Sequence, residues 1–92
     1  MRQITEEKFK AIQVLIDDFS LTGSKVYYYT DDGLDFTIWV TNRTKTVKME
    51  MTYYKATPVR RIAVTYKISD FRMVEYGNIV NVINEMERSV RP

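Results

Sequence analysis

Residues 34–54 have the sequence LDFTIWVTNRTKTVKMEMTYY, in which apolar side chains occupy alternate positions on both sides of a polar segment. Alternation with a period of two is typical of β-strands that bury one face of a sheet. The polar segment Asn42–Lys45 suits a turn, so we predict a hairpin here. The positions expected to face the core are Leu34, Phe36, Ile38, Val40, Val47, Met49, Met51 and Tyr53.

One more strand is predicted on each side of this hairpin. Residues 25–30 include three consecutive tyrosines, which favour β-structure, and Asp31–Gly33 ends in the Asp-Gly pair typical of tight hairpin turns. On the other side, Ala56–Pro58 forces a turn, because proline has no backbone N–H to donate to a strand ladder. The fourth strand follows, with apolar positions at Ile62, Val64, Tyr66 and Ile68.

A helix is predicted before the strands, from about Thr5 to Ser20. Thr5 is a favourable N-cap, and the two glutamates after it suit the positive end of the helix dipole. We expect the loop that contains Gly23 to end this helix. Its apolar face consists of residues three or four apart, namely Phe9, Ile12, Ile16 and Phe19, widened by Leu15.

A second helix is predicted after the strands, from about residue 70 to residue 88. Apolar residues recur there at helical spacing, at Met73, Tyr76, Ile79, Ile83, Met86 and Val90. Gly77 interrupts the pattern. An alternative therefore stays open, in which Phe71–Tyr76 forms a fifth strand and Asn78 caps a shorter helix.

These elements predict an α+β fold of order α-β-β-β-β-α in a single domain that spans residues 1–92. The sheet is a four-stranded antiparallel meander, and the N-terminal and C-terminal helices pack on one of its faces. The residues expected at the centre of the core are Ile38, Met49 and Val64 from the sheet and Phe9, Ile16 and Ile83 from the helices.

The composition argues against most catalytic chemistry. The chain contains neither cysteine nor histidine, so Cys–His and Ser–His nucleophilic sites and the commonest zinc ligands are missing. Asp31, Asp32 and Asp35 cluster, but turn formation explains the first two, and their spacing differs from that of a calcium loop. We therefore expect a protein that is not an enzyme and that uses no cofactor and no metal.

Other sequence features bear on location. The absence of cysteine favours a reducing compartment. The N-terminus is charged, and no segment approaches the roughly 20 apolar residues of a membrane span. We therefore expect a cytoplasmic protein with no membrane association. Asn42-Arg43-Thr44 matches the N-glycosylation pattern, and we interpret it instead as part of a hairpin turn.

Positive charge is concentrated in the centre of the chain. Residues 43–67 contain seven lysines and arginines and one glutamate, although the whole chain has a net charge of only +2. On the predicted strands, several of these residues fall on the face of the sheet that the helices leave open. The residues of this face that we predict to bind a partner are Trp39, Lys48, Tyr54, Arg61 and Lys67.

Two classes of partner fit such a surface. The function that we expect is a small interaction protein that binds and blocks or modulates another protein or a ribonucleoprotein. The size and composition of the chain are typical of accessory proteins of phages and mobile elements, including inhibitors of host defence such as anti-CRISPRs. The alternative is a nucleic-acid-binding module, in which Trp39 and Tyr54 stack on bases and the cations contact phosphates. A homodimer, in which a second subunit covers Trp39, also stays open.

Overall fold

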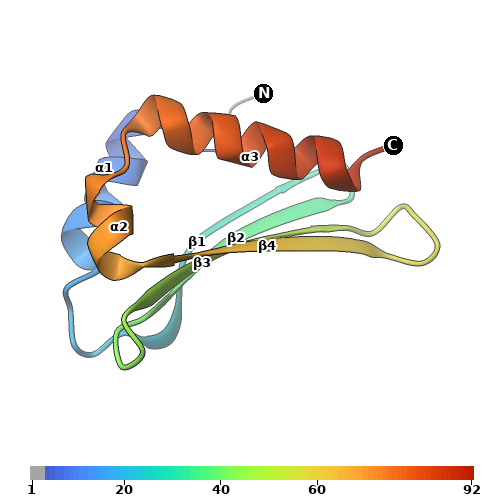
Figure 1. Ribbon diagram of the computed structural model, residues 1–92. Helices are drawn as coiled ribbons and strands as arrows, with labels where there is room; N and C mark the ends of the chain where they lie inside the picture. The colour runs from blue at the N-terminus through green and yellow to red at the C-terminus, as the bar shows by residue number, and fades with distance from the viewer. Residues whose placement is uncertain (1–3) are drawn as a thin grey trace.

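The computed structural model describes residues 4–92 and shows one helix, four strands and two further helices in that order (Figure 1). The four strands form one antiparallel sheet of order β1-β2-β3-β4, which confirms the predicted α+β meander. The elements are α1 (Glu6–Leu15), β1 (Thr22–Asp31), β2 (Leu34–Thr41), β3 (Thr46–Tyr53), β4 (Arg60–Lys67), α2 (Ile68–Met73) and α3 (Tyr76–Val90).

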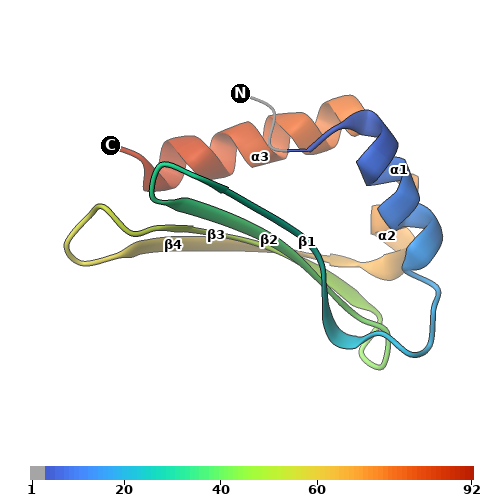
Figure 2. The ribbon, with the colours of Figure 1, turned by 180° about the vertical axis from the view of Figure 1, so that it is seen from behind.

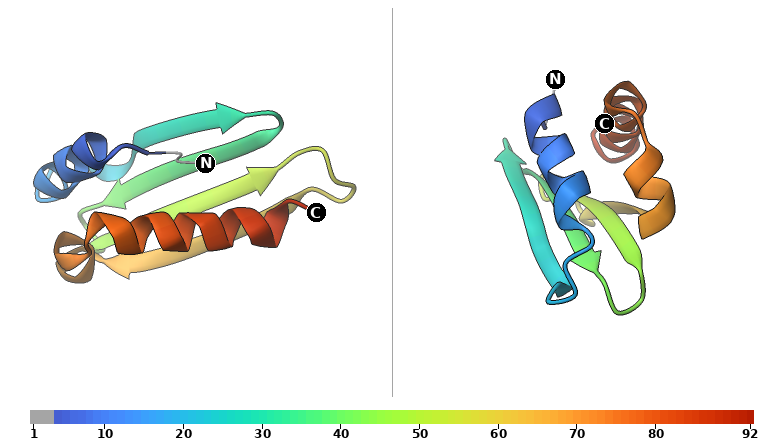
Figure 3. Two further views of the ribbon diagram at one scale, coloured as in Figure 1. Left: turned by 90° about the horizontal axis from the view of Figure 1, so that it is seen from above. Right: turned by 90° about the vertical axis from the view of Figure 1, so that its left-hand side faces the viewer.

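All three helices lie on the same side of the sheet, as the two opposite views show (Figures 1 and 2). The long helix α3 runs along β3 and β4, whereas α1 and α2 pack together at the end of the sheet where α3 begins (Figure 3). No segment among residues 4–92 covers the opposite side of the sheet. We call that side the open face.

The core lies between the sheet and the helices, as the alternation of β2 and β3 predicts. Ile38, Met49, Phe9, Ile16 and Ile83 are all buried, which confirms five of the six expected core residues. The sixth, Val64, is only half-buried, because β4 is an edge strand with a neighbour on one side. The other fully buried apolar residues of β2 and β3 are Leu34, Phe36, Val40, Val47 and Met51.

The three predicted turns connect the strands. Asp32 and Gly33 have φ values of 47° and 81°, and two consecutive left-handed residues are what a two-residue hairpin turn requires. Asn42–Lys45 joins β2 to β3, and its last residue is also left-handed, with a φ of 58°. The third connection contains Ala56–Pro58 and joins β3 to β4.

Helix α1 begins as predicted but ends earlier. Thr5 caps it, and its side chain accepts a hydrogen bond from the backbone of Lys8 at 3.2 Å. The last helical residue is Leu15 rather than Ser20, and Phe19 is 81% exposed instead of extending the apolar face. Asp18 explains the difference, because its carboxylate accepts hydrogen bonds from the N–H and hydroxyl of Ser20 and thereby favours a turn.

The C-terminal helical segment is divided into two helices. Val74 and Glu75 are extended, with ψ values of 132° and 149°, so the predicted helix over residues 70–88 is broken after Met73. Phe71–Met73 is helical, which rules out the alternative fifth strand. Met73 is 79% exposed and does not join the apolar face, whereas Ile79, Ile83, Met86 and Val90 are buried.

A side chain from α1 stabilises this break. The Gln13 Nε2 group lies 3.0 Å from the carbonyl oxygen of Phe71 and 2.9 Å from that of Val74. Carbonyl groups in the last turn of a helix have no partner within the helix, so a donor from another element can satisfy them. Gln13 therefore provides a long-range C-terminal cap for α2.

None of the helices in residues 4–92 has both the length and the apolar composition that a membrane span needs.

Candidate interaction surface on the open face

One row of side chains crosses the open face from edge to edge. Trp39 in β2 is the partner of Lys25 in β1 and of Lys48 in β3. Lys48 is in turn the partner of Thr65 in β4. Because neighbouring strands lie about 4.8 Å apart, each of these four side chains is within contact distance of the next one in the row.

Lys25 reaches this row because β1 contains an irregularity. Counting back from the pair Asp31 and Leu34 with regular register would place Val26 opposite Trp39. The register shifts between Lys25 and Tyr27, so Val26 is an extra residue in a β-bulge. The bulge turns Lys25 onto the open face.

Lys25 forms a compact cluster with two aromatic residues of the open face. Its ammonium nitrogen lies 4.9 Å from the ring centre of Tyr28 and 5.5 Å from that of Trp39. Cations at such distances interact favourably with aromatic faces. Tyr28 is 49% exposed and Trp39 is half-buried. We refer to Lys25, Tyr28 and Trp39 as the aromatic–lysine cluster.

A hollow lies beside this cluster on the open face. It has a volume of about 290 Å³ and is lined by Gly23, Trp39, Thr41, Thr46, Lys48 and Thr65. We call it the threonine hollow. The indole Nε1 of Trp39 is buried and has no hydrogen-bond acceptor among the described residues.

The charges on the open face are mixed rather than uniformly positive. The Lys48 ammonium lies 3.9 Å from a carboxylate oxygen of Glu50, which projects from the same strand and face. Asp35 also lies on this face and accepts a hydrogen bond of 2.9 Å from Thr30. The guanidinium Nε of Arg61 donates to the Thr52 hydroxyl at 3.2 Å.

The structure brings together only two of the five predicted partner-binding residues. Trp39 and Lys48 are direct neighbours, whereas Arg61 and Lys67 lie at opposite ends of β4, about 20 Å apart at roughly 3.3 Å per residue. Tyr54 follows the last residue of β3 and is 53% exposed.

Lys67 lines a second hollow, next to the turn between β2 and β3. This hollow has a volume of about 520 Å³ and shares Thr46, the cross-strand partner of Lys67, with the threonine hollow. Lys45 and Arg72 also line this hollow, and Arg72 forms an ion pair with Asp17.

Sequence reasoning missed Lys25 and Tyr28, which complete the aromatic–lysine cluster. Lys25 lies outside the basic segment 43–67 that drew attention to this face. The sequence around Val26 contains no glycine or proline that would mark the bulge. The position of Tyr28 on the open face could have been predicted, because alternation along β1 places it on the opposite face from Tyr27 and Tyr29.

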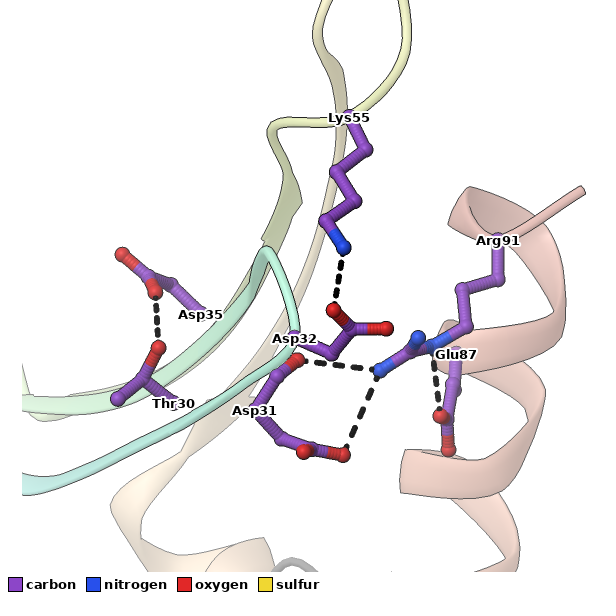
Figure 4. Close-up of polar contacts among 7 residues, drawn as sticks. All are labelled: Thr30, Asp31, Asp32, Asp35, Lys55, Glu87 and Arg91. Atoms are coloured by element: carbon purple, nitrogen blue, oxygen red, sulfur yellow. Dashed lines mark hydrogen bonds and ion pairs between the residues drawn. The ribbon is translucent and has the colours of Figure 1, made fainter.

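The clustered aspartates near the first turn have separate partners (Figure 4). Arg91, the C-cap residue of α3, lies 3.2 Å from the carbonyl oxygen of Asp31 and 3.6 Å from its carboxylate. Asp32 pairs with Lys55, and Asp35 with Thr30. Within residues 4–92, no three acidic groups are placed so that they could share a metal ion.

The glycosylation-like segment has a structural role in the folded chain. Asn42 is 2% exposed, and its side-chain amide donates to the carbonyl oxygen of Ile16 at 2.7 Å. A buried, hydrogen-bonded amide is not accessible for attachment of a glycan. This geometry agrees with the interpretation of the segment as a hairpin turn.

The chain was compared with protein-family models, with curated proteins and with solved structures, and none of the three comparisons finds a match.

Proposed function

We propose that this chain is an interaction protein without catalytic activity, which binds another protein or a ribonucleoprotein through the open face and blocks or modulates it. The observation that supports this proposal is the aromatic–lysine cluster, which spans β1 and β2 on a sheet face that no described segment covers. Aromatic residues surrounded by polar and charged groups are the usual anchors of protein interfaces. The relation to phage and mobile-element inhibitors rests on size and composition alone.

Mixed charge favours a protein partner over a nucleic acid. Lys48 is paired with Glu50, and Asp35 lies on the same face, so a phosphate backbone would meet carboxylates as well as cations. The Trp39 ring is half-buried with the Lys25 ammonium above it, which leaves less of its surface for stacking on a base.

Nucleic-acid binding is the second candidate. Lys25 and Lys48 flank Trp39 on both sides, and Tyr28 and Tyr54 have exposed rings. Proteins that bind single-stranded nucleic acids use such an arrangement, in which the cations contact phosphates and the aromatic side chains stack on bases.

Affinity capture from cells of the native host tests the proposal. Tyr28→Ala removes the exposed ring of the cluster, and Val14→Ala is a matched control because Val14 is 81% exposed on α1, on the other side of the sheet. We expect a protein retained by the wild type and by Val14→Ala to be lost with Tyr28→Ala. A captured protein that both variants retain equally would contradict binding through the open face.

Oligonucleotide titrations test the second candidate. Single-stranded and double-stranded probes are titrated at low and moderate salt against the wild type and against a variant with Lys48, Arg61 and Lys67 replaced by alanine. Binding that weakens steeply with salt and disappears in the triple variant would favour nucleic-acid binding over protein binding as the function of the open face. No binding near micromolar protein at low salt would exclude this candidate.

A further inference from the structure

We propose that the threonine hollow binds the carboxylate of an acidic side chain that the partner inserts into the open face. This inference rests on the proposed function and specifies the chemistry of the partner at that surface. Four observations carry it: the lining of the hollow, the unpaired indole of Trp39, the backbone at Gly23 and the charge of Lys48.

The polar side chains that line the hollow can all donate hydrogen bonds. Lys48 contributes an ammonium group, and Thr41, Thr46 and Thr65 contribute hydroxyl groups, which can also accept. No carboxylate lines the hollow. A carboxylate accepts hydrogen bonds through both of its oxygens, so it complements this set of donors.

The indole of Trp39 supplies a donor that lacks an acceptor. Buried polar groups in proteins are almost always hydrogen-bonded, and an exception needs an explanation such as a ligand. In the free protein, neighbouring side chains cover the indole N–H. Because this N–H is buried, a carboxylate reaches it only when the side chains that cover it move aside.

Gly23 keeps one side of the hollow free of a side chain. Its φ of 72° belongs to the left-handed region that glycine adopts without strain. A Cβ atom at this position would lie 4.0 Å from the Thr41 hydroxyl, and a longer side chain would extend from there into the hollow.

The size and charge of the hollow fit one acidic side chain. A volume of about 290 Å³ is sufficient for one acidic side chain. The Lys48 ammonium and Glu50 form an ion pair at 3.9 Å without a hydrogen bond, so the N–H groups of Lys48 can still donate to an incoming carboxylate.

The indole N–H resonance of the protein reports directly on this site, because the chain contains a single tryptophan. The ¹⁵N-labelled protein is titrated with N-acetyl-glutamate amide and, as a neutral matched probe, with N-acetyl-glutamine amide at constant pH and ionic strength. We expect a saturable downfield shift of the Trp39 resonance with the glutamate probe and none with the glutamine probe.

Two charge-matched variants localise the effect. Lys48→Met removes a cation from the hollow, and Lys10→Met removes one from α1 on the other side of the sheet, so both change the net charge equally. We expect Lys48→Met to weaken binding of the glutamate probe at least several-fold and Lys10→Met to leave it unchanged. Equal weakening by both variants would indicate a general charge effect and overturn the assignment.

Other outcomes of the titration would also overturn the proposed carboxylate site. An unshifted Trp39 resonance, or equal shifts with both probes, would overturn a carboxylate site. Inorganic phosphate that saturates the shift at lower concentration than glutamate would replace the carboxylate by a phosphate and favour the nucleic-acid candidate. The titration needs no partner, so its failure leaves the capture experiment with Tyr28→Ala as an independent test of the proposed function.

Discussion

The side-chain amide of Asn42 donates a hydrogen bond of 2.7 Å to the carbonyl oxygen of Ile16, and so connects the turn after β2 to the C-cap of α1. The same side chain accepts a hydrogen bond of 2.7 Å from the ammonium of Lys45. Its backbone N–H donates to the carbonyl oxygen of Leu21, also at 2.7 Å. One buried residue therefore joins the helix, the turn and the entry to β1.

Replacing this residue should destabilise the fold. Asn42→Ala leaves the buried carbonyl group of Ile16 without a partner, and we expect a loss of about 1–3 kcal/mol in the free energy of unfolding. Thr44→Ala in the same turn is the control, because Thr44 is exposed and should cost less than about 0.5 kcal/mol. Urea denaturation measures both, and equal losses would refute the role of the Asn42 amide.

The centre of the core should be sensitive to loss of volume. Ile38→Ala removes a fully buried side chain from β2, and we expect a cost of about 2–5 kcal/mol. Val14→Ala truncates an aliphatic side chain that is 81% exposed on α1, and it should change the stability by less than about 0.5 kcal/mol. Melting temperatures that differ little between these variants would show that Ile38 contributes less than its burial implies.

Lys25 should influence the fluorescence of the single tryptophan. Lys25→Ala removes the ammonium that lies 5.5 Å from the Trp39 ring and exposes the ring to water. We expect a red shift of the emission and a stability loss of about 0.5–1 kcal/mol, which is the usual size of an exposed cation–π contact. Lys10→Ala on α1 should leave the emission unchanged. An identical spectrum for both variants would argue against the observed placement of Lys25.

The ion pair at the first turn should affect stability in acid. The hydrogen bond from Lys55 and its positive charge lower the pKa of Asp32 below its ordinary value. Because the folded pKa is below the unfolded pKa, the pair stabilises the fold above the unfolded value, and this contribution is lost as the pH falls through the folded pKa. Lys55→Met should therefore raise the pKa of Asp32, measured by carboxyl NMR, whereas Lys67→Met should not.

The sheet was the most predictable part of the fold, because alternation is a local property of each strand. The pattern at Leu34–Val40 specifies which side chains are buried, and Asp32-Gly33 specifies the turn that sets the register with β1. The N-cap at Thr5 was predictable for the same reason, since a cap depends on residues close in sequence.

The remaining features depend on contacts between distant segments. The end of α2 is stabilised by Gln13, which is 58 residues away from Phe71 in the chain, and helical spacing contains no information about such a cap. The candidate surface was found in part, since Trp39 and Lys48 were predicted. Lys25 was missed because its orientation depends on the bulge at Val26, which regular pairing does not reveal.

The irregular register of β1 also has a consequence for the outer edges of the sheet. An unpaired edge strand offers its N–H and C=O groups to strands of other molecules, and this promotes aggregation. The bulges at Gly23 and Val26 break the regular spacing of these groups along β1, so another chain cannot pair with it continuously. The edge at β4 is regular, and the charges of Arg60, Arg61 and Lys67 repel a second copy of the same strand. The solubility of the folded protein should therefore be far more sensitive to neutralising those charges than to changes along β1.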